Sequence, residues 1–320
     1  MTYNMKYRTL IILIFVQAIV LPGFEAWGIE KSRSHYMNIQ TAEELRKIFR
    51  YTGDSVCFLS SHRGGPEKNF PENCIATFEN TLNYSYSVME IDPRYTKDSM
   101  MIVHHDPTLQ RTTNGKGKVA DFTLKELKKL KLKDTEGNVT KYGIPTFEEV
   151  LKWAKGKTIL ILDKKDVPIE DRIKMVEKYK AEAYTIIMAY NFEEAKICYR
   201  LNKNIMMQVF LPTPEKVREF DKTGVPWDNI VAFINHKKPV DSAIFDMIHQ
   251  KGALCIQGTS RNYDREFIEG RVTVIGELKK DYNSLYRFGA DILETDIPVP
   301  VSKVVGNRLS SATYISKIQK

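Results

Sequence analysis

The stretch TILILD, residues 158–163, has four consecutive apolar side chains followed by a carboxylate. A short run without alternation between polar and apolar residues is typical of a strand that is buried on both faces, as in a parallel sheet. The aspartate marks the point where such a strand would leave the core. The same pattern recurs along the chain, and this recurrence predicts the fold.

Seven further strand candidates share the pattern: residues 56–61, 88–92, 183–188, 205–209, 230–234, 254–257 and 291–294. Helix-like segments lie between most of them: residues 75–84, 147–155, 169–179, 192–201, 214–221, 239–251 and 284–288. Eight strands that alternate with helices predict an α/β fold, the (β/α)₈ or TIM barrel. A chain of 320 residues is long enough for this barrel as one domain.

Residues 93–146 interrupt the alternation, because they are too long for a simple turn between a strand and a helix. Within them, residues 100–104 form a short extended run and residues 123–131 have a helical pattern. We therefore expect an insertion in the loop after the second strand. In (β/α)₈ barrels the loops at the carboxyl ends of the strands carry the chemistry, so this insertion is expected beside the active site.

The first 28 residues are expected to be a signal peptide rather than part of the fold. Lys6 and Arg8 precede an apolar run of about a dozen residues, 10–21, which is too short to span a bilayer comfortably. Cleavage near Ala26 or Gly28 would give a secreted or periplasmic protein; an uncleaved anchor is the alternative. We then expect a helical extension over residues 29–55, with a helix at 41–51, a barrel over 56–305 and a tail over 306–320.

The composition restricts the function classes. The formal net charge of +8 could attract anionic substrates or, transiently, anionic lipid headgroups. The lysines are scattered over helix-like segments without interleaved aromatic residues, so no nucleic-acid partner is expected. The four cysteines are too few for a disulfide scaffold and have no CxxC spacing. The oligomeric state is left open.

Polar side chains end several of the predicted strands, and the barrel would bring them to one mouth. They are His62 and Arg63, then Glu90 and Asp92, then His105 after the extended run, and finally Asp163 and Lys165. Histidines, carboxylates and cations that converge from separate strands supply the acids, bases and charges of an active site.

The three carboxylates predict a cation site. Glu90 and Asp92 are two residues apart, so in a strand both side chains point to the same face, and Asp163 could join them from the neighbouring strand. Oxygen ligands without a thiol suit one hard divalent cation, Mg²⁺ or Ca²⁺. The alternative is a set of salt bridges to Lys165 and Arg63 without a metal.

His62 and His105 are the candidate proton donors and acceptors, because imidazole titrates near neutral pH. Each ends an apolar run and adjoins a charged residue, whereas His236 and His249 are interpreted as ordinary core or surface histidines. The guanidinium of Arg63 can bind a phosphate through two parallel hydrogen bonds.

These residues stand in motifs that resemble the successive signatures of the glycerophosphodiester phosphodiesterase family, within the phospholipase C-like phosphodiesterase superfamily. The resemblance covers roughly residues 56–305. The motifs are His62-Arg63-Gly64, Pro71-Glu72-Asn73, Glu90-Ile91-Asp92, Thr96-Lys97-Asp98, His105-Asp106-Pro107, the stretch RTTNGKG at 111–117, Ile144-Pro145-Thr146 and the stretch from Gly289 to Pro298. Each motif is weak alone, but their order and spacing are specific.

The resemblance implies a role for each site residue. It makes His62 and His105 the general acid and base pair, Glu90 and Asp92 metal ligands, and Asp163 the third ligand. Arg63 is implied to bind the phosphate, with Lys165 nearby and Glu72 as a supporting carboxylate. The implied reaction is metal-dependent hydrolysis of a glycerophosphodiester to glycerol 3-phosphate and an alcohol, in which a hydroxyl of the substrate or a water attacks phosphorus.

Three positions depart from the family pattern. Asp163 stands where the family usually has Glu, although the related sphingomyelinase D-like enzymes have Asp-x-Lys there. Cys74 replaces the usual Thr, and Gln257-Gly258-Thr259 ends the seventh strand where many relatives carry a Trp that lines the pocket. Two other functions therefore stay open: a lysophospholipase D or sphingomyelinase D-like lipid hydrolase, and a non-catalytic barrel that binds phosphodiesters.

Overall fold

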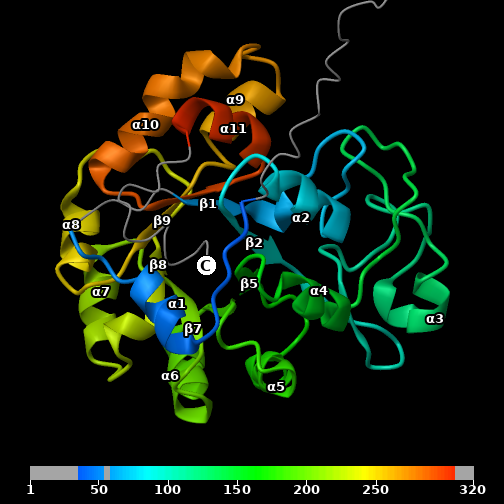
Figure 1. Ribbon diagram of the computed structural model, residues 1–320, viewed down its shortest axis with the longest axis horizontal. Coiled ribbons are helices and arrows are strands. Elements are labelled where there is room, and N and C mark those ends of the chain that lie inside the picture. The colour runs from blue at the N-terminus through cyan, green and yellow to red at the C-terminus, as the bar shows by residue number, and fades with distance from the viewer. Residues whose placement is uncertain (1–34, 54–57, 307–320) are drawn as a thin grey trace, which may run out of the picture. The chain divides into compact units, whose positions relative to one another are not determined.

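A closed barrel of eight parallel strands is the centre of the computed structural model, which describes residues 35–53 and 58–306 (Figure 1). The eight predicted strands are confirmed, and they neighbour one another around the barrel in chain order. They are β1 Phe58–Ser61, β2 Ser87–Ile91, β5 Leu160–Leu162, β6 Thr185–Ala189, β7 Met206–Phe210, β8 Ile230–Phe233, β9 Cys255–Gly258 and β10 Ile292–Thr295.

The barrel closes where the first and last strands pair. Phe58 lies opposite Ile292 and Ser61 opposite Thr295, while Ser61 also pairs with Met89 on the other side. All residues of the eight barrel strands except Phe210 are buried, which explains the continuous apolar runs in the sequence. The closure brings residues from the two ends of the domain together at the carboxyl ends of β1 and β10.

Helices surround the barrel (Figure 1). The predicted ones are α2 Ile75–Leu82, α4 Phe147–Ala154, α5 Ile169–Tyr179, α6 Phe192–Leu201, α7 Pro214–Asp221, α8 Ala243–His249 and α10 Lys279–Phe288. The α9 helix, Tyr263–Ile268, and the α11 helix, Pro298–Val305, were not predicted. The α9 helix has only six residues, and α11 begins with prolines, which read as helix breakers in sequence although they fit the first helical turn. Short 3₁₀ turns complete the fold: η1 His62–Gly64, η2 Val119–Asp121, η3 Trp227–Asn229 and η4 Ile275–Leu278.

The expected insertion after the second strand is a separate lobe with its own small core. It begins with an antiparallel hairpin, β3 Pro93–Tyr95 and β4 Met101–Val103, and contains the single-turn helix α3, Leu124–Leu127. The helix is shorter than the predicted 123–131. The apolar core of the lobe consists of Cys74, Ile102, Leu109, Val119, Leu127, Leu132 and Ile144. The hairpin places His105 beside the barrel mouth.

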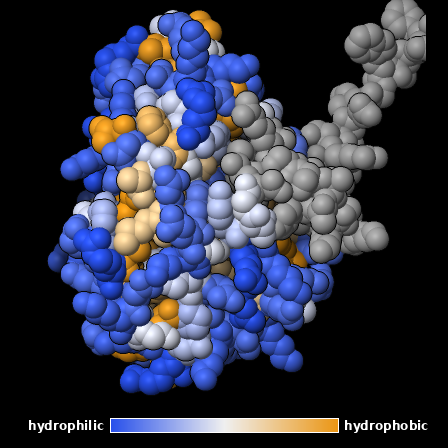
Figure 2. Space-filling model, turned by 90° about the vertical axis from the view of Figure 1, so that its left-hand side faces the viewer, coloured by the Kyte–Doolittle hydropathy of each residue, from blue (hydrophilic) through white to orange (hydrophobic). Residues whose placement is uncertain are grey.

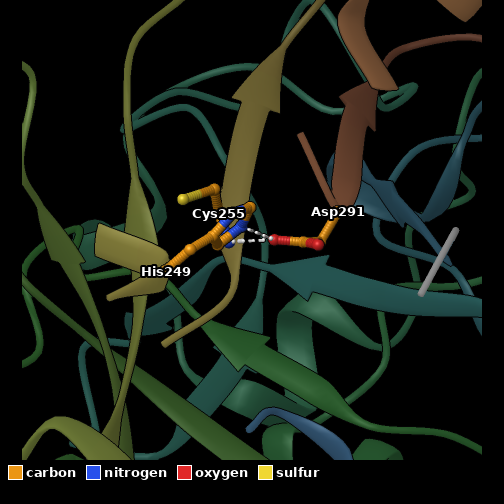
Figure 3. Close-up of side chains that lie close together, drawn as sticks. All are labelled: His249, Cys255 and Asp291. Atoms are coloured by element: carbon orange, nitrogen blue, oxygen red, sulfur yellow. Dashed lines mark hydrogen bonds and ion pairs between the residues drawn. The ribbon is translucent and has the colours of Figure 1, made fainter. Parts of the chain in front are cut away.

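The N-terminal extension covers the opposite end of the barrel. The helix α1, Ala42–Ile48, starts at Thr41, whose side chain and that of Glu44 form a capping box. After it, Tyr51 stacks on the ring of His249 with 3.6 Å between ring centroids. His249 Nε2 lies 2.8 Å from Asp291 Oδ2, which also accepts the backbone N–H of Cys255 (Figure 3). His249 therefore has a structural contact away from the mouth.

Several features predicted at the chain ends lie outside the described residues, namely the signal peptide and the tail after residue 306. Cys57 lies outside them too, whereas Cys74, Cys198 and Cys255 are buried and free. Among the residues that the structure describes, no helix is long and apolar enough to cross a membrane. The face over α7, α8 and α10 is mainly hydrophilic with separate apolar patches (Figure 2).

Candidate active site

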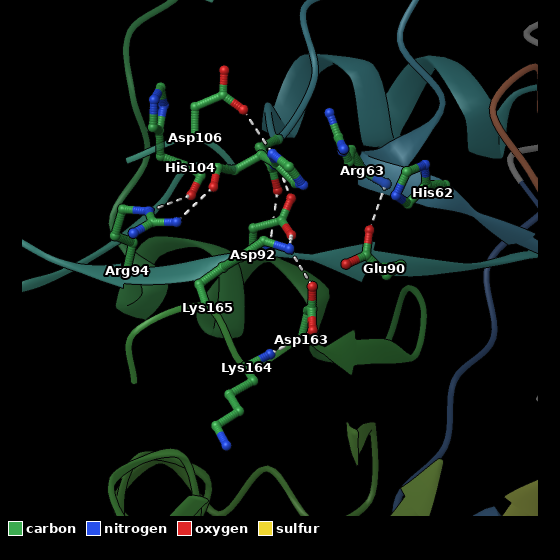
Figure 4. A network of polar contacts seen from close by, with 12 residues as sticks. His62, Arg63, Glu90, Asp92, Arg94, His104, Asp106, Asp163, Lys164 and Lys165 are labelled. Atoms are coloured by element: carbon green, nitrogen blue, oxygen red, sulfur yellow. Dashed lines mark hydrogen bonds and ion pairs between the residues drawn. The ribbon is translucent and has the colours of Figure 1, made fainter. Parts of the chain in front are cut away.

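The polar residues that end the strands meet at the barrel mouth (Figure 4). Six of the eight predicted site residues line one cavity of about 740 Å³: His62, Arg63, Glu90, His105, Asp163 and Lys165. Asp92 lies behind Lys165, with 2.9 Å between Asp92 Oδ1 and Lys165 Nζ. Glu72 lies beside Arg63, with 3.2 Å between Glu72 Oε2 and Arg63 Nη1. The structure thus brings all eight residues together.

Three buried carboxylates form the floor of the site. One oxygen from each of Glu90, Asp92 and Asp163 lies within 4.8 Å of the others. Asn73 donates from its side-chain amide to Asp92 Oδ2 over 2.6 Å, and the backbone N–H of Arg63 donates to Glu90 Oε2 over 2.8 Å. Burial and the nearby charge of Asp92 raise the pKa of Glu90 well above its usual range.

The positive charge that faces these carboxylates is small. Lys165 forms ion pairs with Asp92 and Asp163, and Tyr190 donates its hydroxyl to Asp163. The guanidinium of Arg63 bonds to Glu72 instead of Glu90. Asp92 Oδ1 accepts no aligned hydrogen bond, although Lys165 Nζ is near. Lys165 and the nearby His62 supply at most two positive charges to three buried carboxylates, so the donor set fits a hard divalent cation better than salt bridges alone.

His62 is held by the loop between β1 and α2. Arg63 and Gly64 both have positive φ angles, of 53° and 85°, and this sharp turn directs His62 into the mouth. Gly64 is required there, because a Cβ atom would lie 2.2 Å from the ring of Phe78.

An acidic environment surrounds the His62 ring. Its Nδ1 atom lies 2.5 Å from Asp296 Oδ1. Burial opposes protonation, but the hydrogen bond to Asp296 and the charges of Glu90 and Glu294 outweigh it and raise the pKa of His62 to about 10. The imidazolium is therefore the stable form at neutral pH.

His105 has the opposite tendency. Its Nδ1 atom lies 2.7 Å from Asp106 Oδ1, and Asp106 is held by Arg111 through two contacts of 2.6 and 2.8 Å. Arg111 also binds Glu72 in a bidentate pair. Burial lowers the pKa of His105, and the charges of Arg63 and Lys165 act in the same direction. The two histidines of one cavity therefore favour different protonation states.

Several residues at the site were given no role from the sequence. Asn73, Asp106, Arg111 and Asp296 stand within the quoted motifs, so their place in a motif was a usable signal. Tyr190 follows β6 outside any motif, and only its position at a strand end could have indicated it.

His236, interpreted from the sequence as an ordinary core or surface residue, is hydrogen-bonded at the wall of the cavity. It lines the catalytic cavity, where its Nδ1 lies 3.1 Å from Ser260 Oγ and its Nε2 lies 3.8 Å from Glu294 Oε1. Burial, together with the charges of Arg261 and His62, lowers the pKa of His236 to about 4. A neutral imidazole there can hydrogen-bond a ligand without adding charge.

Gln257, in the stretch where many relatives carry a Trp, has a structural role. Gln257 donates its side-chain amide to the carbonyls of Asn235 and Lys237, over 2.6 and 2.8 Å, and so fixes the loop after β8. The aromatic wall of the cavity comes instead from Tyr190, Phe210 and Phe233, whose successive ring centroids are 5.1 and 5.3 Å apart.

Comparisons with a family model, with a curated protein and with a solved structure all point to the same family. The Glycerophosphoryl diester phosphodiesterase family matches residues 62–266. A glycerophosphodiester phosphodiesterase of Caldanaerobacter subterraneus is 30% identical over 251 residues, which cover 77% of this chain and 96% of that protein. The crystal structure of a glycerophosphoryl diester phosphodiesterase from Parabacteroides distasonis is 39% identical, with a TM-score of 0.82, and the match covers 87% of this chain and 97% of that one.

A third match extends the fold comparison to a complex. An Oleispira antarctica phosphodiesterase, solved with its product sn-glycerol-3-phosphate, has a TM-score of 0.59 to this chain. The two are 18% identical, and the match covers 83% of this chain and 99% of that one. At this identity the likeness is one of fold.

Proposed function

This chain belongs to the glycerophosphoryl diester phosphodiesterase family, and from this membership we propose that it hydrolyses glycerophosphodiesters to glycerol 3-phosphate and an alcohol. We further propose that hydrolysis needs one divalent cation, Mg²⁺ or Ca²⁺, and an acid–base pair of histidines. The observation that carries the proposal is the cavity that His62 and His105 line together with the buried carboxylates Glu90 and Asp163.

The carboxylates Glu90, Asp92 and Asp163 would hold the cation, because their oxygens converge and lie buried. A cation there would supply positive charge at the phosphate oxygens. Lys165 forms ion pairs with two of these carboxylates, Asp92 and Asp163, so it would share them with the cation. Asn73 and Tyr190 keep Asp92 and Asp163 oriented toward the site.

Arg63 is the proposed phosphate-binding residue. It lines the cavity, and its Nε is buried without a hydrogen-bond partner among the described residues. Glu72 holds one terminal nitrogen of the same guanidinium. A phosphate oxygen would satisfy the free donor, because arginine presents its donors in a planar fork that suits phosphate.

The two histidines receive separate roles. His105 favours the neutral form, so it can accept the proton of the attacking hydroxyl or water. His62 favours the imidazolium, so it can donate a proton to the departing alkoxide oxygen as the P–O bond breaks. Asp106 and Asp296 bond the Nδ1 atoms, so each Nε2 is left for this exchange.

The test is an assay of the purified protein with each cation and after exhaustive chelation. Glycerophosphocholine, glycerophosphoethanolamine, glycerophosphoglycerol and lysophospholipids would be compared, and released glycerol 3-phosphate would be measured. We expect cation-dependent release from the first three. If no glycerol 3-phosphate appeared with either cation, the proposed activity would be wrong.

We also propose export, on the basis of the basic start and the apolar run at residues 10–21. Protein recovered outside the cytoplasm should begin near residue 27–29 by mass measurement. Intact Met1 on soluble cytoplasmic protein would contradict this.

A further inference from the structure

A second cavity of about 480 Å³ lies beside the catalytic one. The two share only His62 and Arg63 among their lining residues. The second cavity is bordered by residues 65–68, by Thr135 and Glu136 of the insertion, by the end of α9 and by the start of α11. If the phosphorus of a diester lies next to His62 and Arg63, each of its two alcohol groups can therefore extend into one of the two cavities.

The walls of the second cavity are mostly apolar. They come from Pro66, Phe267, Ile268, Ile297, Pro298, Val299 and Pro300. Ile268 is 54% exposed, so part of this wall is open to solvent. This wall offers few hydrogen bonds to an alcohol rich in hydroxyls, and it suits methyl or methylene groups.

Four acidic and three basic side chains line the second cavity, and most of them are paired with one another or with Arg111. Asp296 bonds to His62, Glu72 to Arg63 and Arg111, and Glu136 to Lys68 over 3.0 Å. Glu67 differs, because its carboxylate accepts a hydrogen bond of 2.6 Å from the neutral amide of Asn80. Among the interactions of the described residues, no cation pairs with Glu67.

We propose that the second cavity binds the alcohol arm of the substrate and favours an alcohol with a cationic ammonium group, such as choline or ethanolamine. This inference rests on the proposed function and specifies its substrate. Glu67 supplies the uncompensated charge, and Phe267 supplies an aromatic face for the ammonium methyl groups. A neutral polyol such as glycerol gains neither interaction.

The division of the two cavities agrees with the division of catalytic roles. His62 stands at their boundary, so its proton is next to the oxygen that leaves with the alcohol. His105 lines only the catalytic cavity, where the attacking hydroxyl or water must be. The glycerol arm accordingly lies in the catalytic cavity, where the polar side chains of His236 and Ser260 can hydrogen-bond its hydroxyls.

The test compares two substrates that differ only in the alcohol arm, glycerophosphocholine and glycerophosphoglycerol. Glu67→Gln should raise KM for glycerophosphocholine and lower its kcat/KM about tenfold, the effect of losing one favourable ionic contact of a partly buried cation. The kcat/KM for glycerophosphoglycerol should stay within about twofold of the parent. Phe267→Ala should give the same discrimination, with a stronger effect on choline than on ethanolamine.

Glu177→Gln is a matched control, because Glu177 also accepts a hydrogen bond from an asparagine amide, that of Asn202, but lies on α5 away from both cavities. It should leave both substrates unchanged. Equal losses for both substrates in Glu67→Gln, or no loss for glycerophosphocholine, would overturn the inference.

A separate measurement distinguishes failure of the inference from failure of the proposed function. If the parent protein hydrolysed neither substrate, calorimetric binding of the two diesters would replace kinetics. Weaker binding of glycerophosphocholine alone to Glu67→Gln would support the subsite even then. Equal affinities in parent and variant would overturn it.

Discussion

Asp296 Oδ1 lies 2.5 Å from His62 Nδ1, although 234 residues separate the two in the chain. His62 follows the first strand of the barrel and Asp296 the last, and these strands pair side by side when the barrel closes. Asp296 is fixed in turn by Asp264, which accepts its backbone N–H over 2.8 Å and the Tyr282 hydroxyl over 2.8 Å. The protonation state of His62 is therefore set by the closure of the fold.

Asp296→Asn should lower the pKa of His62, because it removes the charged hydrogen-bond partner. The acid must be protonated to act, so activity is present below its pKa and is lost as pH rises through it. The alkaline limb of kcat, which a pKa of about 10 would place at high pH, should therefore move toward neutral pH. A kcat profile from pH 5 to 10 checks this; an unmoved limb in a folded variant would remove His62 as the acid.

The histidine roles can be separated with a leaving group that needs no proton. His62→Ala and His105→Ala should each lose about 10²–10⁴-fold in kcat on glycerophosphodiesters, the usual contribution of a positioned acid or base. With a p-nitrophenyl ester, the loss in His62→Ala should be much smaller, whereas His105→Ala should remain impaired. The reverse pattern would exchange the roles, and parental rates would exclude a proton-transfer role.

His104 is the control for this experiment. It adjoins His105 but is buried, and its Nε2 lies 3.2 Å from the carbonyl oxygen of Thr108, outside the residues that line the cavity. His104→Ala should therefore reduce the melting temperature while the folded protein keeps most of its turnover.

The sequence predicted the strands well because a doubly buried strand leaves a direct trace, an apolar run with a polar end. Glu90 and Asp92 were predictable together because strand alternation fixes their common face. The contact of Asp296 with His62 was not predictable, because it depends on which strands pair when the barrel closes. The place of His236 at the cavity was not predictable for a similar reason, because a single histidine after β8 gives no sign of the cavity that it faces.

Glu90→Gln should abolish the stabilisation of the protein by Mg²⁺ or Ca²⁺, and it should still stabilise the metal-free protein. Burial and the charges of Asp92 and Asp163 outweigh the opposing charges of His62 and Lys165 and disfavour a charged Glu90, so the neutral amide relieves repulsion and desolvation. Its oxygen can still accept the N–H of Arg63. In chelator the melting temperature should rise, by about 2–4 °C for each kcal/mol gained. Mg²⁺ or Ca²⁺ should raise it in the parent but not in the variant.

Calorimetric melting with and without each cation measures both effects. Asp228→Asn, a carboxylate in the 3₁₀ turn before β8 and away from the cavity, is the control and should respond to cations as the parent does. If Glu90→Gln bound the cation as tightly as the parent, Glu90 would not be a ligand.

At the opposite end of the barrel, stability should be separable from activity. His249 and Asp291 form a pair whose side chains are 9% and 1% exposed, and the carboxylate also receives the N–H of Cys255 at the start of β9. His249→Ala leaves this buried carboxylate with one partner fewer and opens the space under Tyr51, so it should cost about 3–5 kcal/mol in the free energy of unfolding. Urea denaturation would measure this cost. His249→Gln, which keeps a side-chain donor, should recover part of it. Because this end of the barrel supports the fold and the proposed chemistry occurs at the other end, kcat of the folded His249→Ala protein should equal that of the parent. A loss of turnover without a loss of stability would show that the two ends are coupled.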